Sequence, residues 1–303
     1  MVWYKVYNDL LDFWVDDVDL LSPIEAAKIA VIDIQKKYSP PYNLLFSGGI
    51  DSQAMVYAWL LYGENYKIVT YRYNNDLNYY DYKNAESFCQ YFNVPITYKD
   101  FDLLTFLQSK YKTVSKEFKC SSPQICTHIE MVSDLEGTII FGGDFLSISG
   151  PRISRAILGL YNASLSRPNI IPYFLLHTPE LAYSPASIVL TTEEARDRKR
   201  AEFHKTNVNE KDYNIKIQLY KKGGFKIIPQ EEKYSGFEGV KDLYDKQFKT
   251  RLTWKDRIKY SNRPAQRTFD LLLRYPYEVY GDENIPYRVN KEIFLKNIVK
   301  MNK

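Results

Sequence analysis

A short polar loop between two apolar segments constrains the fold of this chain more than any other feature. Residues 42–46 form an apolar run suited to a buried strand, and residues 53–61 carry apolar side chains at helical spacing. Between them, residues 47–52 read Ser-Gly-Gly-Ile-Asp-Ser. A strand–loop–helix unit of this kind ends at a helix N-terminus, whose unpaired N–H groups bind anions. The sequence therefore predicts a phosphate-binding loop.

The residue types in this loop favour a nucleotide phosphate bound together with a metal ion. Two glycines let the backbone approach an anion closely, and the two serines beside them add hydroxyl donors. Asp51 would repel a phosphate unless a divalent cation lay between the two, which favours Mg²⁺. The alternative is a glycine turn capped by serine. The expected ligand-binding set is Ser47, Gly48, Gly49, Ile50, Asp51 and Ser52.

In this strand–loop–helix setting, the SGGxDS string resembles the pyrophosphatase loop of the PP-loop ATP pyrophosphatases, the adenine nucleotide alpha hydrolase-like superfamily. The resemblance implies an enzyme that cleaves ATP between the α- and β-phosphates and adenylates a substrate. The SGGIDS spelling and an early helix are most similar to the synthetase domain of asparagine synthetase. That branch implies an amide-forming ligase with ATP and Mg²⁺ at the loop.

Alternating strand and helix patterns around the loop predict an α/β fold. The expected elements are a capped helix at residues 22–37, strands at 42–46, 67–73, 94–98 and 138–141, and helices at 53–61 and 82–92. Such alternation predicts a parallel sheet that binds ligands beyond the carboxyl ends of its strands. We expect a five-stranded, mostly parallel, doubly wound sheet of the Rossmann-like (HUP) type, with a helical C-terminal extension.

The same pattern divides the chain into three regions. Residues 1–38 are expected to form a helical lead-in, and residues 39–150 the nucleotide-binding core. Residues 151–303 are expected to form a partly helical region for the substrate or a partner.

A second candidate site follows the strand expected at residues 138–141. A strand that ends in Gly142, Gly143 and Asp144 would face the phosphates from the carboxyl edge of the sheet. In the asparagine synthetases a later acid holds magnesium beside the loop acid, and the resemblance assigns these roles to Asp144 and Asp51. The family's Asp-Glu pair is missing here, because Asp144 follows the glycines directly. The alternative is a simple strand-ending turn.

The end of the second expected strand is a candidate for binding the base. In the superfamily this segment, here Tyr71 and Arg72, lies against adenine and ribose, so its backbone groups would read the base. The tyrosine side chains are interpreted as packing into the sheet.

The cysteines and histidines contribute no motif. Cys89, Cys120 and Cys126 form no disulfide framework, which predicts a reducing compartment, and Cys89 is expected to pack as a small hydrophobe. The spacing of Cys120, Cys126 and His128 fits no standard zinc site. The absence of later cysteines disfavours the zinc-bearing deazaguanine synthases and the sulfonucleotide reductases. A tRNA thiolase that uses Cys120 and Cys126 as a redox pair remains an open alternative. No histidine is assigned a role.

The net charge and the N-terminal sequence exclude few functional classes. The net charge of +4 permits anionic ligands without requiring nucleic acid. The N-terminus lacks a signal-peptide pattern and the apolar runs are too short to span a bilayer, so we expect a cytoplasmic protein without a membrane partner. Position 2 is valine rather than the N-terminal cysteine nucleophile of a glutaminase. An amine substrate would therefore arrive free or from a partner.

The second half is expected to supply the acceptor site. Arg152 and Arg155 are candidates for holding phosphate or an acidic group. Lys221 or Lys222, before a glycine turn between strand-like runs, would match the C-terminal loop lysine of related synthetases, although solvation at the surface is preferred. Residues 234–302 read as helices rich in aromatic and basic side chains, which favour core packing over an RNA surface.

These observations predict ATP-dependent adenylation of a small-molecule acceptor, followed by displacement of AMP by an amine. Asp51 and Asp144 would hold Mg²⁺, and the chemistry would rest on positioning and electrostatics. Two alternatives are a PP-loop enzyme that modifies an RNA or DNA base and an ATP-binding module without turnover.

Overall fold

Parallel strands form the centre of the fold. The computed structural model describes residues 21–118, 120, 122–143, 155–189, 191–193 and 210–230, with residues 236, 237, 240, 243, 246 and 247. Its strands are β1 (Tyr42–Leu45), β2 (Tyr66–Tyr73), β3 (Thr97–Phe101), β4 (Thr138–Phe141) and β5 (Ile170–Ile171). They form one five-stranded sheet in the order β3-β2-β1-β4-β5, and every neighbouring pair is parallel. The prediction of a five-stranded parallel α/β sheet is confirmed.

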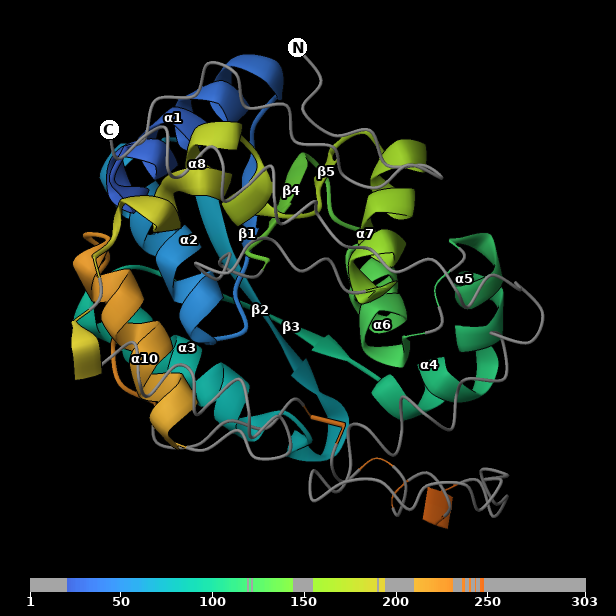
Figure 1. The fold of residues 1–303 in the computed structure, drawn as a ribbon. Helices are drawn as coiled ribbons and strands as arrows, with labels where there is room; N and C mark the ends of the chain where they lie inside the picture. The colour runs from blue at the N-terminus through green and yellow to red at the C-terminus, as the bar shows by residue number, and fades with distance from the viewer. Residues whose placement is uncertain are drawn as a thin grey trace.

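Helices cover both faces of this sheet (Figure 1). The described helices are α1 (Pro23–Lys37), α2 (Ile50–Tyr62), α3 (Tyr79–Tyr91), α4 (Leu103–Ser109), α5 (Tyr111–Glu117), α6 (Pro123–Met131), α7 (Arg155–Ser166), α8 (Pro179–Tyr183) and α10 (Glu210–Lys222). Side chains of α1, α2, α3, α8 and α10 share one core cluster, and those of α4 to α7 share another. Among the described helices, none combines the length and the apolar character needed to cross a lipid bilayer.

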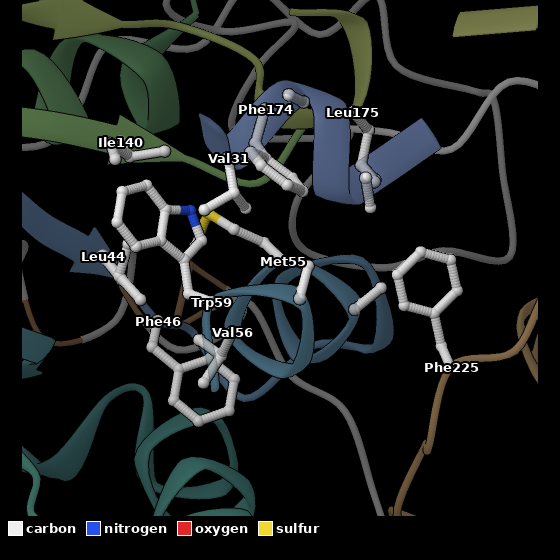
Figure 2. Close-up of a cluster of buried hydrophobic side chains, with 14 of the residues drawn as sticks. Val31, Leu44, Phe46, Met55, Val56, Trp59, Ile140, Phe174, Leu175 and Phe225 are labelled. Atoms are coloured by element: carbon white, nitrogen blue, oxygen red, sulfur yellow. The ribbon is translucent and has the colours of Figure 1, made fainter. Parts of the chain in front are cut away.

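The first core cluster joins the sheet to the segment after α10. Trp59 of α2 is fully buried and lies beside Leu44 and Ile140 of the central strands (Figure 2). The same cluster includes Phe225, which follows α10 in the chain. Burial of these large side chains supplies the main driving force for folding, so it also holds the segment after α10 against α2.

Most expected elements occur within a few residues of their predicted bounds. The helix at Pro23 begins with the expected cap, in which the Ser22 N–H donates to Glu25 Oε2 at 3.2 Å. Strand β3 begins at Thr97 rather than at residue 94, because Pro95 has no N–H to give to a ladder. Cys89 packs into the first cluster as a small hydrophobe, as expected.

The strand-like run expected before the glycine turn at residues 223–224 is helical. Residues 210–222 form α10, in which Ile217, Leu219 and Tyr220 are buried. Apolar residues at 215, 217 and 219 alternate as in a strand, which explains the wrong prediction. The run after the turn, residues 225–228, is not a strand either. The helices expected over residues 234–302 lie almost entirely outside the described residues, as does the boundary expected at residue 150.

A buried hydroxyl fixes the end of β1 just before the polar loop. Thr70 of β2 donates from Oγ1 to the carbonyl of Phe46 at 2.7 Å. Thr70→Val should lower the free energy of unfolding by about 1 kcal/mol, because valine keeps the shape but cannot donate this hydrogen bond. Urea denaturation measures the change. Thr70→Ser keeps the hydroxyl and serves as the control, and a greater loss of stability in the serine variant would contradict the role given to the hydrogen bond.

Candidate functional site

A cavity of about 360 Å³ opens at the carboxyl edge of the sheet, where β1, β2 and β4 end. Ligands of open α/β sheets bind at this edge. The sequence-predicted residues that line it are Ser47, Gly49, Asp51, Ser52, Tyr71, Gly142 and Gly143. The two glycine-bearing segments, which are about ninety residues apart in the chain, therefore meet at one cavity because β1 and β4 are neighbours.

The polar loop presents hydroxyl groups and the N-terminus of α2 to this cavity. Gly49 is the N-cap residue of α2. Ser52 Oγ donates to the Gly49 carbonyl at 2.8 Å and lies 3.3 Å from Ser47 Oγ. The helix dipole and the first N–H groups favour an anion at such a position. Ile50 is buried in the first core cluster, so its side chain anchors the helix start rather than contacting a ligand.

Packing against α3 requires glycine at position 48. Its φ is +70°, and a Cβ placed on it would lie 2.4 Å from the Asp81 carbonyl oxygen and 2.6 Å from the Ala85 nitrogen. Both atoms belong to α3, so the loop presses against that helix. Gly48 does not line the cavity among the described residues. Gly49 lines the cavity, and the expectation that the loop glycines let the backbone approach an anion stays a prediction.

Asp51 is held by two side chains of α10. Lys216 Nζ lies 2.6 Å from Asp51 Oδ2, and the Tyr220 hydroxyl donates to Oδ1. The Asp51 side chain keeps 15% of its exposure, so the ion pair is partly shielded from water and its attraction is only partly screened. Residues four apart share one face of a helix, which brings both groups to a single carboxylate.

Lys216 is a candidate functional residue that the sequence did not single out. Lys221 and Lys222 were the lysines considered for a phosphate role, with solvation at the surface preferred, and Lys222 does lie on the surface, where it donates to the carbonyl of Val189 at 3.3 Å. The helical spacing of Lys216 and Tyr220 was the available signal. That spacing could not be linked to Asp51 from the sequence, because the link depends on α10 being a helix that packs beside the loop.

Glutamines tie the segment after α10 to the loop. The buried Gln53 side chain donates to the Gly48 carbonyl at 3.1 Å and accepts from the Ile228 N–H at 2.8 Å. Gln230 donates to the same Gly48 carbonyl. The second half of the chain therefore contributes directly to the shape of the loop.

Helix α6 supplies a wall of the cavity that the sequence did not predict. Gln124, Ile125, His128 and Met131 line it. Burial lowers the pKa of His128 to about 4, so its imidazole is neutral near pH 7. Its spacing from Gln124 is helical, but this pattern alone does not distinguish a cavity wall from an ordinary helix face.

The end of β2 differs in part from the expected base-binding edge. The Asn78 side chain accepts from the Tyr73 N–H and donates to the Tyr71 carbonyl, each at 2.8 Å. Tyr71 is buried, as the packing interpretation expects, and its hydroxyl donates to the Met131 carbonyl. Arg72 does not line this cavity: its guanidinium pairs with Asp100 at 2.9 Å, whereas Val69, Thr70, Tyr71 and Tyr73 of β2 line the cavity.

Several other predicted residues fall elsewhere. Asp144 and Arg152 lie outside the described residues, and of Arg155 the structure describes the backbone at the start of α7. Cys126 is buried and donates from Sγ to the Cys120 carbonyl at 3.2 Å. The contact with Cys120 and burial raise the pKa of Cys126, which keeps the thiol protonated. The two cysteines of the thiolase hypothesis are therefore in contact, and that hypothesis stays a prediction.

The carboxylates at the cavity fit a metal shared with a ligand better than a cage made by protein. Asp51 and Asp81 line the cavity, and the described residues contain no cluster of three or more side chains suited to a metal. Mg²⁺ is commonly held by one or two carboxylates together with phosphate oxygens and water. The donor set therefore fits Mg²⁺ that is bound together with a nucleotide. No protein-family model matches the chain, and no curated protein shows significant sequence similarity to it.

Proposed function

We propose that this chain is an ATP-dependent adenylating enzyme of the PP-loop type, built on a Rossmann-like core with a helical C-terminal extension. It would transfer AMP to an acceptor, release pyrophosphate, and then let an amine displace AMP. The described cysteines are free thiols, which supports a reducing, cytoplasmic compartment.

One observation carries this proposal. The loop at residues 47–52 lies at the N-terminus of α2, and it lines a cavity at the carboxyl edge of a parallel sheet. Serine hydroxyls and helix N–H groups at that position suit the phosphates of a nucleotide. The strand order β3-β2-β1-β4-β5 supports the same interpretation, because the connections reverse direction at β1, directly before the loop.

In the proposed reaction the protein contributes positioning and charge. Ser47, Ser52 and the first N–H groups of α2 would hold the leaving pyrophosphate. Mg²⁺ bound by Asp51 would neutralise the charge that builds on that leaving group. Lys216, which pairs with Asp51 in this structure, would exchange that carboxylate for a phosphate oxygen. An acceptor oxygen would attack the α-phosphate as the bond to the β-phosphate breaks.

An ATP-binding module without turnover is the second candidate. The observation that favours it is the state of Asp51, since both carboxylate oxygens have partners on α10. If that arrangement persists with nucleotide bound, Asp51 has fewer lone pairs left to hold a metal. The two candidates therefore differ in what happens to a single side chain.

Pyrophosphate release distinguishes these functions. The protein is incubated with ATP, Mg²⁺ and a mixture of metabolites, and pyrophosphate is measured with and without protein. Affinity for a fluorescent ATP analogue is measured in parallel. The adenylating function predicts magnesium-dependent pyrophosphate above background. ATP binding without pyrophosphate would favour the binding module, and the absence of both would contradict either candidate.

A further inference from the structure

Strand β2 extends beyond its neighbour β1 at the edge of the cavity. The last residue of β1, Leu45, pairs with Val69, whereas β2 continues to Tyr73. The Phe46 N–H donates to the Val69 carbonyl at 2.9 Å, so Val69 directs its backbone groups toward β1. Residues two apart in a strand direct their backbone groups to the same side, so those of Tyr71 and Tyr73 point to the space beyond the end of β1. Both tyrosines line the cavity there.

The carboxamide of Asn78 covers two of these backbone groups. Its Oδ1 accepts from the Tyr73 N–H and its Nδ2 donates to the Tyr71 carbonyl, each at 2.8 Å. Asn78 is 5% exposed and is the N-cap residue of α3, yet its side chain makes no capping hydrogen bond. The carboxamide therefore serves the end of β2 rather than the helix that follows it.

The strand edge under Asn78 has the chemistry to distinguish one purine from another. A carbonyl beside an N–H pairs with a donor and an acceptor, which a carboxamide supplies. At ring position 6 adenine carries an amino donor, whereas guanine carries a carbonyl acceptor, and both have the N7 acceptor beside it. Only adenine could donate from position 6 to the Tyr71 carbonyl while it accepts from the Tyr73 N–H. While Asn78 holds both groups, neither purine can use them.

The apolar part of the cavity at the strand ends offers contacts that all purines share. Leu45, Val69 and Phe141 line the cavity from three neighbouring strands and belong to the second core cluster. Apolar contacts distinguish poorly between molecules of nearly equal shape, so these side chains would contact adenine and guanine alike. Selection between the two bases therefore depends on hydrogen bonds at the edge of the ring.

We propose that Asn78 determines base selectivity in this site by covering the strand edge, so that adenine and guanine nucleotides bind with similar affinity. The inference rests on the proposed function and names the class of nucleotide, a purine nucleoside triphosphate that is held by its phosphates rather than by the edge of its base. Asn78 is a specificity-determining residue and takes no part in the transfer of the nucleotide.

Calorimetry with two uncleavable nucleotides tests this proposal. The probes are the ATP and GTP analogues with a methylene group between the α- and β-phosphates, each titrated in the presence of Mg²⁺. The unmodified protein is compared with Asn78→Ala, which uncovers the strand edge. The matched control is Asn169→Ala, because Asn169 also donates to a backbone carbonyl, that of Gly137 at 2.7 Å, and neither of these residues lines the cavity.

The unmodified protein should bind the two analogues within about fivefold of each other, because no hydrogen bond to the strand edge favours either base. Asn78→Ala should bind the ATP analogue at least about tenfold more tightly than the GTP analogue, the gain expected when adenine pairs with the two uncovered backbone groups. The Asn169→Ala control should bind both analogues as the unmodified protein does.

A larger preference for either analogue in the unmodified protein would overturn the proposal, because other cavity residues would then read the base. An unchanged ratio of affinities in a folded Asn78→Ala variant would overturn it as well. Asn78→Ser replaces the alanine variant if that variant does not fold, since serine is favoured at an N-cap and has a single polar atom for the two groups. Failure to bind either analogue would contradict the proposed function itself, whereas selective binding contradicts the role of Asn78 alone.

Discussion

Asp51→Asn should abolish magnesium-dependent pyrophosphate release, lowering its rate by at least about 10²-fold. Asparagine keeps the size of the side chain but removes the negative charge that would hold Mg²⁺ beside the phosphates. It also removes the ion pair with Lys216, which is 2.6 Å away in this structure. The measurement is pyrophosphate release over a range of Mg²⁺ concentrations. The variant should stay inactive at concentrations that saturate the unmodified protein.

A matched control separates this effect from a general loss of charge. Asp134→Asn also removes an acid from an ion pair, with Lys99 at 2.8 Å, but that pair is exposed on the surface. Exposed pairs contribute little to stability, so this variant should keep normal activity and folding. Normal pyrophosphate release by Asp51→Asn would rule out the metal assignment. Thermal unfolding of both variants checks that lost activity does not reflect an unfolded protein.

The parts of the fold that the sequence could predict are those governed by local patterns. The apolar run at residues 138–141 is bounded by glycines on both sides, and β4 has the predicted bounds. Ser22 and Glu25 form the predicted cap because both groups lie within one helical turn. The position of the loop between a strand and a helix also predicted the correct edge of the sheet, since parallel strands end together.

The parts that escaped prediction depend on contacts between distant segments. Lys216 meets Asp51 because α10 packs against α2, and no local pattern encodes that contact. Gly48 lies in a sequence typical of a phosphate loop, yet glycine is required at this position because the backbone of α3 lies against it. His128 lines the cavity through the packing of α6, which no local pattern indicated. Sequence patterns thus located one wall of the cavity, while tertiary packing supplied the other residues around it.

Lys216→Met should lower pyrophosphate release by about 10²-fold, because it removes the described cation nearest to the loop acid. Methionine keeps the apolar stem of lysine, so the packing of α10 beside Ile217 and Tyr220 should survive. The matched control is Lys222→Met, which removes a surface lysine of the same helix that donates to the Val189 carbonyl. That variant should retain activity.

The direction of the change at Lys216 also decides between two roles for this lysine in the proposed enzyme. An adenylating enzyme needs the ammonium group for charge that develops on the phosphates, so its loss slows turnover even at saturating ATP. If Lys216 instead serves only to occupy Asp51, removing it frees the carboxylate, and pyrophosphate release would stay equal or rise. Single-turnover measurements at saturating ATP separate a slower chemical step from weaker binding. A rate that is unchanged or faster would assign Lys216 to restraining Asp51 rather than to stabilising the phosphates.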